Sequence, residues 1–437
     1  MAYSSKASDH VPSGRAIVGL DALRALACLW VISHHVFQHL AYETRRESYL
    51  ASCLVRGHLG VAIFFVLSGF LLATPFWKSF RKTNGLPNLK VYAARRLGRI
   101  VPEYFLCLII CGFLTGQLLT RADALNLVPS FLFLNSFFWW TFLPIWNNPP
   151  LWSIGIEMLF YAMLPLFALG MQKARTRARA WTFGLAVIAL IIAVHCFVLK
   201  RIQIQIPDDR ELTHTELLGS SMAIDLNGLI LFTHFLIGVF AADLYLAAME
   251  RSPHRKREAR KTFGFNRFDG IALILLAAVF LVDWDGLPFF WRISSRMAAW
   301  GLAYHWPYFH LLIMGLLLAL PFSRIIGPIL DNRFMRWTAA ISFGLYMWHM
   351  PLLGWLETIW PSQLDGTVSG RLLLEAVLLV GTYCLASISY YFIGLPILRR
   401  AHQIGTSKPA PLHPNQEPIP ELGVPKPTEV ASSEASS

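Results

Sequence analysis

The chain has 437 residues, of which 55% are hydrophobic and only 15% are charged, and its formal net charge at pH 7 is +12. Soluble domains carry about 25% charged residues, whereas the apolar residues here form runs of about 20, the length that crosses a hydrocarbon core as a helix. These features exclude a soluble enzyme, a disordered chain and a disulfide scaffold. They predict an all-α integral membrane protein, a polytopic bundle of about ten transmembrane helices.

The predicted spans follow one another along the whole chain. They cover residues 18–40, 57–77, 100–119, 151–171, 181–199, 224–249, 269–284, 300–320, 338–360 and 372–398. A further apolar stretch at 126–146 is interrupted by Pro129, Asn135 and Pro144, and it is either an eleventh span or a re-entrant or interfacial segment.

The basic residues favour ten spans with both termini in the cytoplasm. In that arrangement most of the 38 lysines and arginines lie on the inner side, as cytoplasmic loops of membrane proteins require. An eleventh span would place the later basic loops outside and remove this asymmetry. We therefore expect a disordered segment at 1–16, a transmembrane domain at 17–398 and a disordered cytoplasmic tail at 399–437. The positive charge then reports orientation and needs no nucleic-acid partner.

The first span carries an unusual set of ionisable groups, namely Asp21, Arg24, His34, His35 and His39. Such groups are costly inside a membrane and mark a site or a pathway by default. On a helix, Arg24 and His35 lie about 20° apart on one face and about 16 Å apart along the axis. Arg24 then lies in the inner half of the membrane and His35 in the outer half. The alternative is that Asp21 pairs with Arg24 as an interface anchor and the histidines bond to neighbouring helices.

Five sequence blocks in order carry a family resemblance. They are Leu20–Ala27 with ten residues between Arg24 and His35, Gly60–Leu71, Arg96–Pro102, Leu151–Tyr161 and Ser342–Leu352. Together they resemble the membrane acyltransferase-3 family, whose hallmark is an Arg or Lys, ten residues and then a His. Two positions depart from it, because Ala62 stands where many members have Asp, and Met158-Leu159 where many have Glu-Gln. Many members also carry a C-terminal esterase-like domain, which the short tail here leads us not to expect.

The resemblance implies transfer of an acyl group, usually acetyl from acetyl-CoA, onto a hydroxyl of a sugar or another acceptor. A hydroxyl needs a base whose pKa is near the working pH, which points to histidine. We expect His35 to deprotonate the acceptor or to carry the acyl group transiently, and Glu157 to orient its imidazole. Arg24, Arg96 and Arg99 are the candidate ligands for the phosphates and pantetheine of the donor, although Arg96 and Arg99 also fit an ordinary positive-inside anchor.

Two further residues are assigned to the substrate channel, each with a structural alternative. Ser68 precedes Gly69-Phe70, a sequence that also allows close helix packing, and His349 in the ninth span either shapes the channel or is a buried, hydrogen-bonded histidine. Cys107 and Cys111 lie four residues apart without other soft ligands, so we interpret them as packing residues and expect no metal.

The favoured function is a membrane O-acyltransferase of the bacterial inner or plasma membrane. Acyl-CoA is its expected co-substrate, no cofactor is expected to be bound permanently, and the acceptor is a carbohydrate, a glycolipid or a glycosylated small molecule. One alternative is an acylase of a hydrophobic secondary metabolite such as a macrolide sugar. Another is a transporter or flippase, in which the Arg24–His35 face is a proton or anion path.

Overall fold

Helices make up all the regular structure in the residues that the computed structural model describes, which are 17–137, 148–205, 226–251, 264–281, 302–361 and 366–404. The α-helices are α1 Leu20–Phe37, α2 Tyr42–Glu47, α3 Tyr49–Val55, α4 Leu59–Thr83, α5 Leu89–Leu114, α6 Arg121–Phe131, α7 Trp152–Ala174, α8 Arg177–Gln205, α10 Gly228–Arg251, α12 Arg267–Leu281, α14 Tyr308–Ala319, α15 Ile326–Leu330, α16 Arg333–Ile359, α18 Val368–Ser389 and α19 Leu395–Gln403. Short 3₁₀ turns are η1 Arg56–His58, η2 Asn135–Phe137, η4 Pro149–Leu151 and η5 Leu320–Phe322, and a π-helical turn, η6 Tyr390–Gly394, joins α18 to α19.

Each of the ten predicted spans overlaps with one of these helices, although some bounds differ: α5 begins at Leu89, before the predicted 100, and α14 begins at Tyr308, after the predicted 300. Seven helical segments in the described ranges are long and apolar enough to cross a membrane, and they contain α1, α4, α5, α7, α8, α10 and α18. The helices α12, α14 and α16 fall on the other three predicted spans. The all-α, polytopic fold is therefore confirmed, whereas the number of spans and the side of the termini stay predictions.

The uncertain stretch at 126–146 is only partly described. The helix α6 ends at Phe131, just after Pro129, and the turn η2 follows, while residues 138–147 lie outside the described residues. The predicted disordered segments also lie outside them, except that α19 continues to Gln403, past the predicted domain end at 398.

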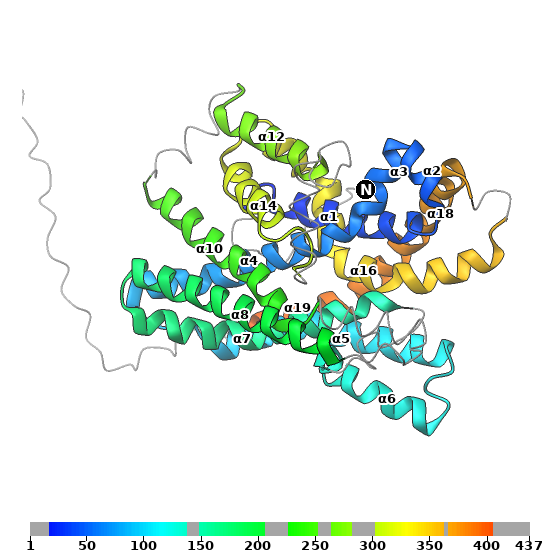
Figure 1. Ribbon diagram of the computed structural model, residues 1–437, viewed down its shortest axis with the longest axis horizontal. Helices are drawn as coiled ribbons and strands as arrows, with labels where there is room; N and C mark the ends of the chain where they lie inside the picture. Colours follow the sequence, from blue (N-terminus) through cyan, green and yellow to red (C-terminus); the bar gives the residue numbers. More distant parts are fainter. Residues whose placement is uncertain are drawn as a thin grey trace, which may run out of the picture.

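The helix α1 lies near the centre of the molecule and packs between α4 and α16 (Figure 1). The helix α10 runs along α4 and is also central. Of its most apolar 18-residue stretch, 83% is buried inside the protein, compared with 22% for the corresponding stretch of α8. Two glycines permit the α4–α10 contact: a Cβ at Gly69 would lie 2.0 Å from the Phe235 carbonyl oxygen, and one at Gly238 would lie 2.0 Å from that of Val66. Small residues allow helix backbones to approach in this way, so Gly69 has the packing role considered for its segment.

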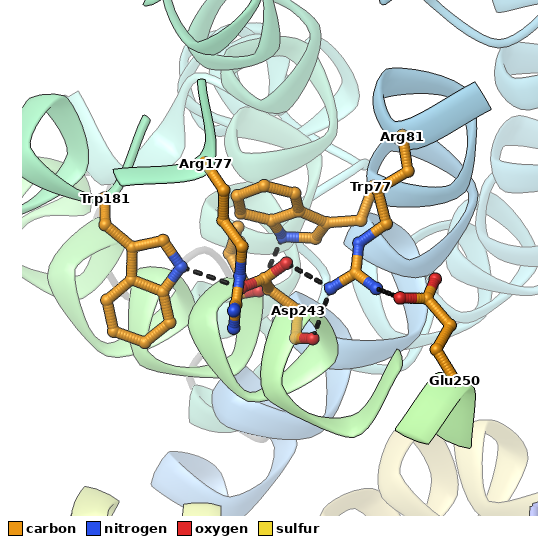
Figure 2. A network of polar contacts seen from close by, with 7 residues as sticks. Trp77, Arg81, Arg177, Trp181, Asp243 and Glu250 are labelled. Carbon is orange, nitrogen blue, oxygen red and sulfur yellow. Dashed lines mark hydrogen bonds and ion pairs between the residues drawn. The ribbon is translucent and has the colours of Figure 1, made fainter. Parts of the chain in front are cut away.

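One end of the bundle is fastened by a network around the fully buried Asp243 of α10. Figure 2 shows its carboxylate accepting hydrogen bonds from Arg81 at 2.5 Å, from Arg177 at 2.6 Å and from the Trp181 indole at 2.8 Å. Arg81 also pairs with Glu250 at 2.7 Å. A buried carboxylate is tolerated only when it is paired and hydrogen-bonded in this way. The network therefore holds α4, α8 and α10 together.

Candidate functional site

A cavity of about 760 Å³, its open mouth included, lies between α1, α4, α5, α7 and α16. Five of the seven predicted site residues line it: Arg24, Ser68, Arg96, Arg99 and Glu157. They come from four helices that are far apart in sequence, so the tertiary fold brings together residues that the motifs alone list separately. The remaining two, His35 and His349, lie outside its lining.

The cavity is cationic. Within the described ranges, Arg24, Arg96 and Arg99 form no ion pair, and Glu157 is the only acidic residue that lines the cavity. The Nε atom of Arg96 is buried without a hydrogen-bond partner. Asp21 makes no ion pair with Arg24, so the anchor pair considered above does not form here. An unpaired guanidinium in a cavity is costly unless an anionic ligand completes its hydrogen bonds.

Glu157 is held inside this cavity by two hydroxyl groups. Its Oε1 accepts hydrogen bonds from Tyr161 at 2.6 Å and from Ser68 at 3.2 Å. Tyr161 lies one turn further along α7 and also lines the cavity. It is fixed in turn because Pro165 lacks an N–H, which leaves the Tyr161 carbonyl free to accept a 3.1 Å hydrogen bond from Tyr92 of α5. Glu157 therefore faces the arginines, and its hydrogen bonds do not come from His35.

His35 and His349 lie together on the facing sides of α1 and α16. Their ring centroids are 5.2 Å apart with the planes at 34°. His349 is fully buried, and its Nδ1 is 2.9 Å from the Tyr346 carbonyl oxygen. Since a carbonyl only accepts, Nδ1 carries the proton and Nε2 of a neutral ring is left as an acceptor. That Nε2 and the Nδ1 of His35 are buried without hydrogen-bond partners.

Further histidines surround this pair. The ring of His34 lies 5.0 Å from that of His35, and the ring of His58 lies 5.3 Å from that of His34. His34 also contacts the Val55 carbonyl oxygen through Nδ1. His39, by contrast, lies beyond the end of α1 at Phe37 and is exposed, so it does not extend the polar face of that helix. The histidine cluster is thus built around His35 by α1, η1 and α16.

Sequence reasoning missed Ser153, Tyr161 and Tyr346, which all line the cavity. Helical spacing from the motif residues is the signal that would have found two of them, because Tyr161 follows Glu157 by four residues and Tyr346 precedes His349 by three. No group of three or more His, Cys, Asp or Glu suited to a metal ion occurs within the described residues. Cys107 and Cys111 are buried with their sulfur atoms 3.8 Å apart.

Comparison with known proteins gives one family and several bacterial relatives. The family described as acyltransferase domain matches residues 17–391. "Putative peptidoglycan O-acetyltransferase YrhL" of Bacillus subtilis is 26% identical over 397 residues, which cover 88% of this chain and 55% of the relative. "Peptidoglycan O-acetyltransferase OatA" of Listeria monocytogenes is 24% identical over 415 residues, covering 90% of this chain and 56% of the relative. The chain thus spans about half the length of these two curated relatives, and no solved structure matches it.

Proposed function

Because the chain belongs to the acyltransferase domain family, whose enzymes transfer acyl groups, we propose that it is a membrane O-acetyltransferase that moves acetyl from acetyl-CoA to a carbohydrate hydroxyl. The apolar helices and the bacterial relatives make it a multi-pass bacterial membrane protein. Peptidoglycan is the acceptor that the names of two relatives give, and it is the acceptor class we propose here.

The donor is proposed to enter the cationic cavity. Coenzyme A is polyanionic, and planar guanidinium groups bind phosphates with two parallel hydrogen bonds. Arg96 and Arg99 lie on one face of α5 and line the cavity together with Arg24. His35 lies about 16 Å further along α1 than Arg24. A long, flexible pantetheine arm suits that separation, because the phosphates then stay at the arginines while the thioester approaches the histidine pair.

His35 is proposed to act as the general base. It takes the proton of the acceptor hydroxyl, the oxygen attacks the thioester carbonyl, the C–S bond breaks and the thiolate leaves with the proton from the imidazolium. The alternative is that His35 first accepts the acetyl group and then passes it to the acceptor. In either case His349 is the neighbour that shapes the site. Glu157, which was expected to orient His35, is better placed to position Tyr161 and to balance the charge of Arg24.

The observation that carries this proposal is the pair of unpartnered, buried imidazole nitrogens of His35 and His349; His35 lies on the same helix as the unpaired Arg24, about 16 Å away along the axis. His35 and Arg24 both lie on α1, whereas Arg96 and Arg99 of the proposed donor site lie on α5. Neither feature is explained by packing, because a packed polar group is normally hydrogen-bonded.

The test is transfer of radiolabelled acetyl from acetyl-CoA to peptidoglycan fragments by the purified protein in lipid nanodiscs. A base of this kind contributes about 10²–10⁴-fold, so His35→Ala should lower the rate by that factor. The matched control is His39→Ala, an exposed histidine on the same segment, which should keep the wild-type rate. Wild-type transfer by a folded His35→Ala protein would overturn the proposed base, and movement of substrate without covalent labelling would support the transporter alternative.

A further inference from the structure

Glu103 of α5 is a buried carboxylate one helical turn away from Arg99. Arg96, Arg99 and Glu103 follow one another at intervals of three and four residues, so the helix places them in one row. Arg96 and Arg99 line the cavity, whereas Glu103 does not and is only 3% exposed. Among the described residues, Glu103 forms no ion pair with Arg99. The spacing thus favours an Arg99–Glu103 pair that does not form.

The segment between α18 and α19 holds the Glu103 carboxylate. Ser389, the last residue of α18, donates a hydrogen bond to Oε2 of Glu103 at 3.3 Å. Gly394, the last residue of the π-helical turn η6, faces the other oxygen, because a Cβ built there would lie 2.0 Å from Oε1. Only a glycine leaves room for the carboxylate at this point. Glu103 is therefore fixed between Ser389 and Gly394.

We propose that Glu103 is a positioning residue for donor binding: η6 keeps its carboxylate off Arg99, and Arg99 stays free to bind a phosphate of the donor. A carboxylate paired with Arg99 would compete with the phosphate for the same guanidinium N–H groups. Glu103 is buried, so a displaced carboxylate has no solvent to move into, and Arg99 is the basic residue nearest to it along α5. This inference rests on the proposed function, because it assumes that acyl-CoA occupies the cavity.

The π-helical turn explains how the contact is built. Such a turn adds one residue to a helical turn and is frequent at functional sites. Here it lies just before Pro396, which has no N–H and interrupts the hydrogen-bond ladder of the helix. The helix α19 then packs on α5, where a Cβ at Gly98 would lie 3.0 Å from the Cβ of Ala401. These contacts seat η6 along the part of α5 that carries Arg99 and Glu103.

The test displaces the carboxylate by adding one methyl group. Gly394→Ala should raise the KM for acetyl-CoA in nanodiscs about tenfold, because Arg99 then pairs with Glu103 and a charge-assisted contact to the donor is lost. The kcat should stay within a factor of about three, since the phosphates are bound equally in the ground and transition states. The matched control is Gly381→Ala on α18, where the added Cβ meets Leu352 Cδ2 at 2.7 Å, and its KM should equal that of the wild type.

A neutral variant separates ion pairing from crowding. Glu103→Gln has nearly the shape of glutamate without its charge, so in the Gly394→Ala background it should return the KM to within a factor of about three of the wild-type value. Packing damage alone would persist in this double variant, and a KM that stays raised would overturn the proposal.

Ser389→Ala is a second, milder way to release the carboxylate. It removes the hydroxyl without adding an atom and should raise the KM for acetyl-CoA about three- to tenfold. The same substitution in a Glu103→Gln background should leave the KM unchanged, because no charge is released. If Gly394→Ala elutes as an aggregate, Ser389→Ala decides, and an unchanged KM overturns the positioning role of Glu103.

Failure of this inference can be told apart from failure of the proposed function. If the wild-type protein transfers no acetyl from acetyl-CoA, the proposed function fails. If it transfers acetyl but Arg99→Ala keeps the wild-type KM, donor binding by Arg99 fails and the role of Glu103 fails with it. If the KM depends on Arg99 but Gly394→Ala leaves it unchanged, Glu103 has no positioning role and the proposed function stands.

Discussion

At the scale of single residues, the most informative feature is that three arginines face one cavity without an ion pair among the described residues. The partly buried cation of Arg81 shows how the same chain treats a structural arginine, since it bonds to both Asp243 and Glu250. Arg24, Arg96 and Arg99 lack such partners. The contrast supports the proposal that these three guanidinium groups bind an anionic ligand.

Charge reversal separates a donor site from a membrane anchor. Replacing Arg96 and Arg99 together by Glu should raise the KM for acetyl-CoA about 100-fold or more, because each of the two lost hydrogen bonds to a charged group contributes about 1.5–3 kcal/mol. The kcat should change much less, since the phosphates are bound equally in the ground and transition states. The measurement is steady-state transfer at varied acetyl-CoA.

The matched control for this pair is Lys90→Glu, an exposed basic residue near the start of the same helix. A membrane anchor is weakened by charge reversal at any of these positions, whereas only the cavity residues bind a donor. A KM equal in the two variants would contradict donor binding by Arg96 and Arg99.

At the scale of elements, proline residues explain how the helices of the site are joined. Pro165 in α7 and Pro351 in α16 each leave a carbonyl without its helical donor. Each freed carbonyl accepts a side chain from another segment, Tyr92 in the first case and Asn148 in the second. A position that weakens one helix thus becomes a specific link between helices, in a setting where no water satisfies the backbone.

The link at Asn148 can be measured by a double-mutant cycle. Asn148→Ala should destabilise the protein by about 1–3 kcal/mol, because the buried Met347 carbonyl loses its amide donor and keeps only the weak Cys107 thiol at 3.5 Å. In a Pro351→Ala background the backbone N–H at position 351 returns, and the same Asn148→Ala substitution should then cost much less. Unfolding by denaturant in detergent micelles provides the four stabilities, and equal losses in the two backgrounds would refute the link.

At the scale of the whole molecule, the Asp243 network includes basic residues from two segments that are predicted to be cytoplasmic. Arg81 and Arg177, which bond to Asp243, belong to the segments that the charge distribution places in the cytoplasm. His58 of the histidine cluster lies directly before α4, at the opposite end of that helix from Arg81. Under the predicted topology, the proposed donor arginines lie on the cytoplasmic side and the proposed base His35 lies toward the outer face.

Cysteine labelling tests this orientation in intact cells. A membrane-impermeant maleimide should react with Glu43→Cys, which lies in the predicted outer loop, and not with Lys82→Cys, which lies at the predicted inner end of α4; both positions are exposed. The signal of the parent chain is subtracted, and permeabilised cells should label both variants. Labelling of Lys82→Cys alone in intact cells would reverse the predicted topology.

The sequence was sufficient to predict which residues belong to much of the site, but not how those residues are placed relative to one another. The helical period correctly placed Arg24 and His35 on one helix, because spacing along a single helix is a local property. It could not show that His35 adjoins His349, or that Glu157 bonds to Tyr161 and Ser68 instead, because helix-to-helix contacts depend on how the spans pack. The end of α1 at Phe37, which leaves His39 outside the helix, could not be predicted either, because the apolar run continues to residue 40.

The sequence by itself determined the class of the protein, the position of its helices and the family to which it belongs. These depend on the lengths of apolar runs and on short motifs, which a membrane imposes locally because every backbone polar group must be satisfied within its own segment. Only the tertiary structure decided that the arginines share a cavity, that two histidines lie beyond it and that Tyr346 stands between them. Those relations arise from side-chain packing among α1, α5, α7 and α16, which no single segment specifies.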